Sequence, residues 1–206
     1  EFIISYNQEE RGKPLCYMMK YYLAIDIGAS SGRHILSHIE DGKIILEEVY
    51  RFENGMEEKD GHLIWNYRKL FDNIVEGLKI CKTVGKIPES VGIDTWGVDY
   101  ALLDKNDEVI GDVFAYRDGR TEEPIKKLHS VIPFEKLYER TGSQFQIYNT
   151  IYQLYTDKLS GKLDNAERFL MMPDFFAFLL TGVKKNEFTN ASTTGLLSAK
   201  TREWDM

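Results

Sequence analysis

The residues best suited to chemistry lie in one short segment. Asp26 is followed by the small-residue run Gly28-Ala29-Ser30-Ser31-Gly32 and then by Arg33. The two glycines allow a tight turn to which a ligand can come close, and successive amides in such a turn can form a concave nest for phosphate oxygens. Asp26 is suited to a hydrated Mg²⁺, which keeps several waters and needs few carboxylates. Arg33 then either adds charge to the phosphate or lies on the surface.

The same residues also fit an ordinary turn beside a buried Asp26 that bonds to the backbone, so the segment alone leaves both interpretations open. A Walker-type P-loop is excluded because it needs Gly-Lys-Ser/Thr, whereas Arg33-His34 follows Gly32 here. The run also resembles the nucleotide loop of short-chain dehydrogenases, but no Tyr-x-x-x-Lys pair follows it. Tyr17 and Lys20 lie upstream with the wrong spacing.

Hydrophobic patterning predicts the elements that position this turn. A short apolar run ending at Gly28 predicts a central strand, and two more strands are predicted on either side of Asp41-Gly42, a strong hairpin signal. Apolar residues at intervals of three and four then predict a helix capped by Asn66. These elements are the strands over 22–27, 33–39 and 43–52, the helix over 67–81, and a strand over 91–93 that runs into Asp94.

The remainder of the chain is predicted to be mostly helical after a further strand. Ala101-Leu102-Leu103 predicts that strand, a polar turn precedes Val109-Ile110, and Glu57-Glu58-Lys59-Asp60 is interpreted as a solvated loop. Thr121 is expected to cap a helix with Pro124 in its first turn, and Pro133 to open another that ends near Gly142. The apolar run 174–180 is expected to be buried. The alternation predicts an α/β fold with a mixed central sheet flanked by helices.

Composition narrows the possible partners and location. The formal net charge of −7 argues against a broad nucleic-acid or anionic-membrane surface, which needs clustered basic residues. No stretch approaches the roughly 20 apolar residues of a membrane span. Only Cys16 and Cys81 occur, in no metal-type spacing, so a reducing cytoplasm is expected. Residues 1–18 show no period and are expected to be a leader or appended segment, with the domain over 19–206.

Three further segments resemble one known family. They are Gly92-Ile93-Asp94-Thr95-Trp96-Gly97-Val98-Asp99, Ala115-Tyr116-Arg117-Asp118-Gly119-Arg120-Thr121, and the region from Leu170 through Thr194 with its Met-Pro-Asp-Phe-Phe and Leu-Thr-Gly strings. Together with the turn after Asp26, they resemble the FGGY family of carbohydrate kinases, and within it the rhamnulokinases. The resemblance implies a ribonuclease-H-like lobe of the actin/sugar-kinase ATPase superfamily. It covers the N-terminal half only, so a C-terminal lobe is expected to be missing.

The resemblance also implies roles for individual residues. By matching position, Ala29, Ser30, Ser31, Gly32 and Arg33 would bind the phosphates of ATP, and Asp26 would serve Mg²⁺. Gly97 matches a sugar-contacting position, with Asp94, Thr95 and Trp96 shaping the same wall and Tyr116 placing an aromatic face against the sugar. Tyr148 and Asn149 would line the same cleft. Asp118 and Arg120 would either pair and fix their loop or contact substrate.

The reaction implied is transfer of the ATP γ-phosphoryl group to the 1-hydroxyl of L-rhamnulose, in rhamnose catabolism. The catalytic base is expected in the missing lobe, so no residue of this chain is assigned that role. Two alternatives remain open: a kinase for another ketose or polyol, such as xylulose or glycerol, or a non-catalytic fragment that binds a nucleotide or sugar.

Overall fold

A four-stranded mixed sheet organises the N-terminal part of the chain. The computed structural model describes residues 19–205, so the expectations for residues 1–18, Cys16 included, lie outside the described residues. The strand order is β3-β2-β1-β6, with β1 and β2 antiparallel, β2 and β3 antiparallel, and β6 parallel to β1. The strands are β1 (Tyr21–Ile27), β2 (Ser31–Glu40), β3 (Lys43–Glu53) and β6 (Pro88–Asp94). The mixed sheet and its predicted strands are confirmed.

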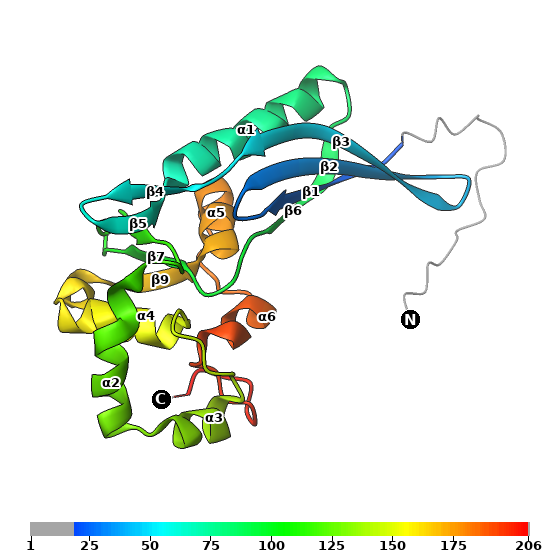
Figure 1. Cartoon of the computed structure of the whole chain (residues 1–206). Helices are drawn as coiled ribbons and strands as arrows, with labels where there is room; N and C mark the ends of the chain where they lie inside the picture. Colours follow the sequence, from blue (N-terminus) through cyan, green and yellow to red (C-terminus); the bar gives the residue numbers. More distant parts are fainter. Residues whose placement is uncertain (1–18, 206) are drawn as a thin grey trace, which may run out of the picture.

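A two-residue turn joins β2 to β3 as predicted. Asp41 and Gly42 have φ of 49° and 74°, and turns with both central residues at positive φ match the twist of the strands they connect. The resulting hairpin extends beyond the rest of the sheet (Figure 1).

One long helix covers the inner face of this sheet. In α1 (Tyr67–Thr83) the buried residues recur on one face, and the side chain of Asn66 accepts a hydrogen bond from the amide of Lys69 at 3.1 Å. The predicted helix and its cap are therefore confirmed. On the sheet side, the fully buried ring of His34 lies against Gly77, and its Nε2 lies 3.2 Å from the carbonyl of Ile74.

A second helix, α5 (Met172–Thr181), packs on the same face of the sheet and completes the main core. Phe175 and Phe176 are fully buried, but Leu180 is 37% exposed, so the expectation that the whole run 174–180 is buried is wrong. On the opposite face of the sheet, Tyr22 and Leu46 are exposed.

Two smaller sheets connect this part to the helices. The strands β4 (Met56–Lys59), β5 (His62–Trp65) and β8 (Val113–Phe114) form one sheet, and β7 (Tyr100–Leu103) pairs with β9 (Arg168–Met171). The solvated loop expected over 57–60 is therefore wrong, because 56–59 is a strand of a second hairpin that turns at Asp60-Gly61. Val109 forms only an isolated bridge with Leu103.

The C-terminal part is mostly helical and lies on the other side of β7 and β9 from the main sheet (Figure 1). Its helices are α2 (Glu122–Val131), α3 (Phe134–Thr141), α4 (Thr150–Leu159) and α6 (Phe188–Ala191), with short 3₁₀ turns at Gly119–Thr121, Lys162–Asn165 and Ser192–Thr194. Thr121 precedes α2 as expected, but its hydroxyl donates to the carbonyl of Ile147 at 2.8 Å instead of accepting a cap bond. Across residues 19–205 no helix combines the length and apolarity that crossing a membrane requires.

Candidate functional site

The turn between β1 and β2 has free hydrogen-bond donors. Gly28 N–H donates to the carbonyl of Ser31 at 2.8 Å, which closes the turn, and Asn54 donates to the carbonyls of Gly28 and Ser30 from outside it. The amides of Ala29 and Ser30 have no hydrogen-bond partner within residues 19–205. Ser30 is exposed, so this turn can present amide donors to an anion.

Gly32, at the end of the same turn, is required for a different reason. A Cβ atom at Gly32 would lie 2.1 Å from the ring of Phe52, so the glycine makes room for an aromatic ring of the core. Arg33 follows on β2, and its Nε lies 3.5 Å from Oδ2 of Asp26. Arg33 therefore faces the carboxylate that precedes the turn.

Two carboxylates meet where β1 and β6 end. Asp26 is the register partner of Asp94 on the neighbouring parallel strand, and adjacent strands lie about 4.8 Å apart. The side chain of Asp26 is half exposed and Asp94 is exposed. The interpretation of Asp26 as a buried, backbone-bonded residue is therefore wrong, and the pair can serve a hydrated divalent cation.

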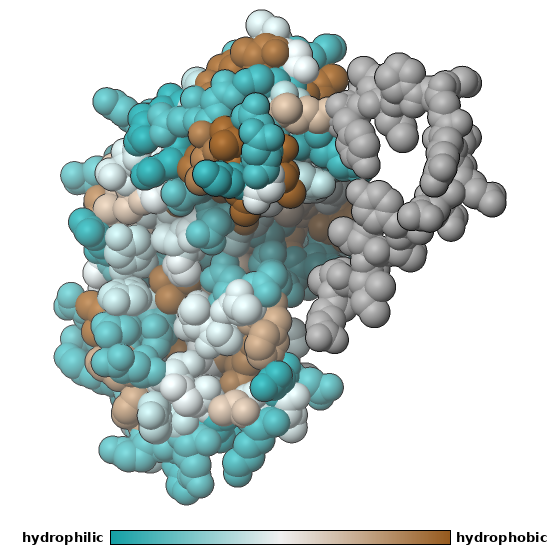
Figure 2. All heavy atoms as spheres, turned by 90° about the vertical axis from the view of Figure 1, so that its right-hand side faces the viewer, coloured by the Kyte–Doolittle hydropathy of each residue, from teal (hydrophilic) through white to brown (hydrophobic). Residues whose placement is uncertain are grey.

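A cleft of about 710 Å³ opens beside the end of β6. Its polar end contains Asp94, Thr95 and Gly97 together with residues of the α6 region, and its apolar end lies between β6 and α5. Figure 2 shows the face of the molecule on which the sheet and the helical part are separated by a recess. Residues of the cleft beyond the predicted set are Leu78, Val91, Ile93, Pro173, Asp174, Ala177, Leu180, Thr181, Glu187, Thr189, Asn190 and Thr193.

Gly97 brings backbone close to the opposite wall of this cleft. A Cβ atom at Gly97 would lie 3.3 Å from Oγ1 of Thr193 and 3.7 Å from Oδ1 of Asn190. The glycine thus widens the polar end of the cleft by about one methyl group.

A strained turn follows Gly97. Asp99 N–H donates to the carbonyl of Gly97 at 2.9 Å, and the residue between them, Val98, has φ of 69°. A bond across three residues with positive φ at the centre defines the rarer, strained form of γ-turn. A β-branched residue seldom adopts this conformation, which costs about 1–3 kcal/mol. Val98 is buried, so neighbouring groups must hold it there.

Asp99 is a buried acceptor for four donors. Its Oδ2 accepts from the indole N–H groups of Trp65 (2.7 Å) and Trp96 (2.8 Å) and from the amide of Tyr116 (3.0 Å), and its Oδ1 accepts from Gln153 (2.9 Å). Burial nevertheless raises the pKa of Asp99 to about 6, because desolvation outweighs these bonds.

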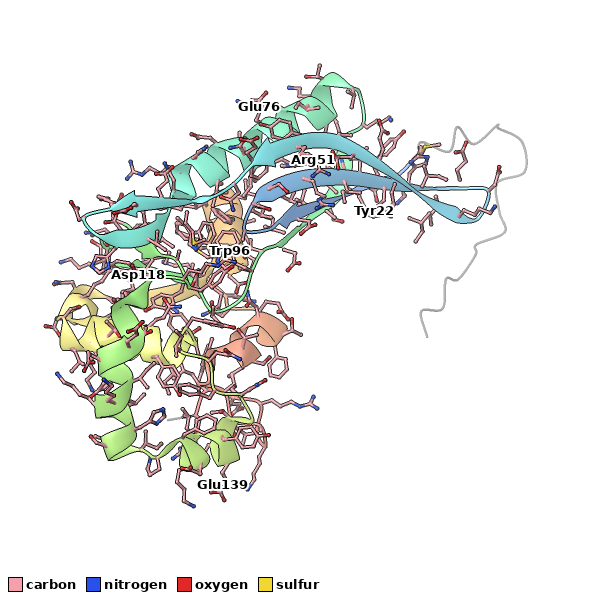
Figure 3. The ribbon with its side chains drawn as sticks, in the orientation of Figure 1. Tyr22, Arg51, Glu76, Trp96, Asp118 and Glu139 are labelled. Atoms are coloured by element: carbon pink, nitrogen blue, oxygen red, sulfur yellow. The ribbon has the colours of Figure 1, made fainter. Side chains whose placement is uncertain are left out.

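The aromatic residues expected to shape the sugar site form a cluster with one another. The ring centroids of Trp96 and Trp65 are 4.0 Å apart. The ring centroid of Tyr116 lies 6.3 Å from that of Trp65 and 5.7 Å from that of Tyr148. None of these rings lines the cleft beside Gly97. Figure 3 shows Trp96 at the junction between the main sheet and the helical part. Asn149 also lies outside the cleft, buried immediately before α4.

The expected ion pair between Asp118 and Arg120 is wrong. Arg120 instead pairs with Asp157 of α4 at 2.5 Å, and both side chains are buried. Asp118 accepts bonds from the amides of Leu63 (2.8 Å) and Arg120 (3.0 Å) and from His62 (3.1 Å). Both residues fix the loop, and neither lines the cleft beside Gly97.

Sequence reasoning missed several residues around the site. No sequence pattern indicates a role for Trp65, Thr150 or Gln153, which bond to Val98 or Asp99. The same holds for Asp174 and Glu187, two carboxylates of the cleft. The segment containing Asn190 and Thr193 is part of the family resemblance. Its many hydroxyl groups are the signal that could have indicated a wall of the cleft.

Comparison with known proteins identifies the family. The N-terminal domain of the "FGGY family of carbohydrate kinases" matches residues 21–206. The chain belongs to this family. A rhamnulokinase of Halalkalibacterium halodurans is 49% identical over 189 residues, 91% of this chain and 40% of that protein. A rhamnulokinase of Oceanobacillus iheyensis is 46% identical over 191 residues, 92% of this chain and 41% of that protein. The FGGY chain described here thus spans about two fifths of these relatives.

Solved structures confirm the fold. Gluconate kinase from Lactobacillus acidophilus superposes with a TM-score of 0.78 at 20% identity, covering 91% of this chain and 38% of that one. A xylulose kinase from the same organism superposes with a TM-score of 0.77 at 20% identity, covering 91% of this chain and 38% of that one. The α/β lobe is therefore that of the FGGY sugar kinases, which have the actin-like ATPase fold.

Proposed function

We propose that this chain is the nucleotide-phosphate and sugar-binding lobe of an ATP-dependent kinase that phosphorylates L-rhamnulose at its 1-hydroxyl. One observation carries the proposal. The parallel register of β1 and β6 pairs Asp26 with Asp94, so the turn with free amides and the Gly97 cleft lie at the same edge of the sheet. Donor phosphate and acceptor hydroxyl can then be held near each other.

Phosphoryl transfer depends mainly on positioning and charge stabilisation. The amides of Ala29 and Ser30 are free to bind phosphate oxygens, and Arg33 can supply positive charge. Asp26 and Asp94 fit a hydrated Mg²⁺, which needs only one or two protein carboxylates. When bound, the metal neutralises charge on the phosphates.

The sugar would lie at the polar end of the cleft. Hydroxyl and amide groups of Thr95, Asn190 and Thr193 line this end, and Gly97 leaves room for a sugar ring against the backbone. Such groups suit a polyhydroxylated ligand because each sugar hydroxyl both donates and accepts hydrogen bonds. The relatives named rhamnulokinase, at 46–49% identity, favour L-rhamnulose over other sugars.

A kinase for a different ketose or polyol is the alternative. The fold is shared with gluconate and xylulose kinases, and sugar choice depends on the whole pocket. An ADP-release assay with L-rhamnulose, xylulose, gluconate and glycerol separates these substrates. The assay requires the protein of rhamnulokinase length that carries this chain. Turnover with another sugar but not with L-rhamnulose would overturn the substrate assignment.

Asp26→Ala tests the phosphate and metal end of the site. We expect at least a hundredfold loss of kcat, in the range of a removed charge-stabilising group, while the thermal midpoint changes little because Asp26 is half exposed. Asp72→Ala is the matched control, since Asp72 is an exposed carboxylate on α1. Retained turnover in Asp26→Ala would remove Asp26 from the mechanism.

A further inference from the structure

The strained turn at Val98 is held from one side by α4. The Val98 carbonyl accepts from Oγ1 of Thr150 at 2.7 Å and from Nε2 of Gln153 at 3.3 Å. Both donors are buried, with Thr150 fully inaccessible. The turn points this carbonyl away from the cleft and toward the first turns of α4.

Gln153 also ties the turn to its surroundings. Its Nε2 lies within hydrogen-bond distance of Asp99 Oδ1 (2.9 Å) and the Tyr148 carbonyl (3.0 Å), and its Oε1 accepts from Arg120 at 3.1 Å. Arg120 is in turn fixed by the buried pair with Asp157. The same helix therefore anchors the central residue of the turn through the Val98 carbonyl and its last residue through the Asp99 carboxyl group.

Neither Thr150 nor Gln153 lines the cleft, whereas Gly97 does. Strained backbone persists only where the surroundings over-determine it, and such strain concentrates at functional sites. Here the hydrogen bonds from α4 hold Val98 in its strained conformation. The residue directly before Val98 is Gly97, which faces the cleft.

We propose that Thr150 and Gln153 are positioning residues, which hold the γ-turn at Val98 and so set where Gly97 presents its backbone to the sugar. This inference rests on the proposed function, because it assumes that the cleft beside Gly97 binds the sugar. Within residues 19–205 no hydrogen bond joins the turn after β1 to either residue, so nucleotide binding should not depend on them.

The test compares Thr150→Val with Thr150→Ser in the protein of rhamnulokinase length that carries this chain. Valine keeps the shape but removes the donor, whereas serine keeps the donor. We expect Thr150→Val to raise the KM for L-rhamnulose about five- to tenfold, the size of effect that one lost hydrogen bond gives, with the KM for ATP unchanged. Thr150→Ser should stay within about twofold of the wild type.

Near-UV circular dichroism provides a second readout. The neighbouring, tilted rings of Trp65 and Trp96 both donate to the carboxyl group of Asp99, the last residue of the turn. Thr150→Val should therefore alter their signal, and Thr150→Ser should not. If Thr150→Val does not fold, Thr150→Ala makes the same comparison without placing a methyl group against the Val98 carbonyl.

The outcomes separate the two proposals. A wild-type protein without turnover on any sugar would remove the proposed function, and this inference with it. An active wild type whose KM for the sugar is unchanged by Thr150→Val would overturn the inference alone. Equal rises in the KM values for sugar and ATP would also overturn it, because they indicate a general structural defect.

Discussion

At Gly97 the wall of the cleft is formed by backbone atoms, because glycine has no side chain. An added methyl group there would lie 3.3 Å from Oγ1 of Thr193, which is close enough to narrow the polar end without blocking folding. A substitution at Gly97 should therefore reduce the space available for a sugar without much change in the stability of the lobe.

Gly97→Ala tests this expectation. We expect a rise of about tenfold or more in the KM for L-rhamnulose, similar to one misplaced methylene in a fitted pocket, with little change in the thermal midpoint. Gly92→Ala is the control, because Gly92 lies on β6, the strand that precedes Gly97, and a Cβ there meets nothing within 4 Å. Similar KM values in the two variants would show that Gly97 does not border the sugar.

Asp99 makes the stability of the lobe depend on pH. Burial raises its pKa to about 6, above the usual value near 4, so the folded state binds the proton more tightly than the unfolded state. The free energy of unfolding should then fall as the pH rises from about 4 to about 6, by up to about 3 kcal/mol at 1.4 kcal/mol per unit.

Asp99→Asn isolates this contribution. All other titrating groups are the same in the wild type and the variant. As the pH rises from 4 to 7, the unfolding free energy of the wild type should therefore fall relative to that of the variant. Urea denaturation of both proteins across that range measures the difference. A difference that stays constant would show that Asp99 does not titrate there.

At the scale of elements, the closest fit between α1 and the sheet that we test is at Gly77 and His34. A Cβ atom at Gly77 would lie 2.3 Å from the ring of His34, and burial lowers the pKa of that histidine, so the ring enters the helix surface uncharged. Alanine normally stabilises a helix relative to glycine by about 1 kcal/mol. Here the contact with the ring should reverse that preference.

Gly77→Ala should therefore destabilise the lobe by about 1–3 kcal/mol, as overpacking does. The cost should shrink when His34 is also replaced by alanine, and a double-mutant cycle by denaturant unfolding measures this coupling. Additive effects of the two changes would contradict the proposed fit.

Local patterns were sufficient to predict the main elements. Alternation and the Asp41-Gly42 turn predicted the β2–β3 hairpin, and the helical period with Asn66 predicted α1. The strand over 56–59 was missed because three of its four residues are charged, although Asp60-Gly61 carries the same turn signal. The strand over 168–171 was missed because its apolar residues continue into those of α5.

The site was predictable only where its residues are adjacent in sequence. Asp26 and the turn after it, and Asp94 with Gly97, were found because each group lies at the end of one strand. The partner of Arg120 was wrong because the true one, Asp157, lies 37 positions away on another helix. Long-range pairs of this kind leave no signal in spacing along a single sequence.

At the scale of the whole molecule, the described lobe contains the groups that we propose position phosphate and sugar, but it spans about 40% of the length of its rhamnulokinase relatives. Phosphoryl transfer also needs a base near the acceptor hydroxyl, and no residue here is assigned that role. We therefore expect the 206-residue chain to release at least a hundredfold less ADP per minute than the longer protein.

An ADP-release assay with L-rhamnulose on both proteins measures this difference, and circular dichroism of the shorter chain serves as the folding control. Comparable sugar-dependent turnover from the shorter chain would show that it contains a complete catalytic centre.

The position of β6 at the margin of the main sheet has a practical consequence. Within residues 19–205 this strand pairs with β1 on one side only, and Val91 on it is exposed. A row of unpaired backbone groups beside apolar side chains is a template for strand addition by another chain. Preparations of this lobe by itself should consequently be prone to aggregation at high concentration, and a charged substitution along that margin offers a rational way to keep it dispersed.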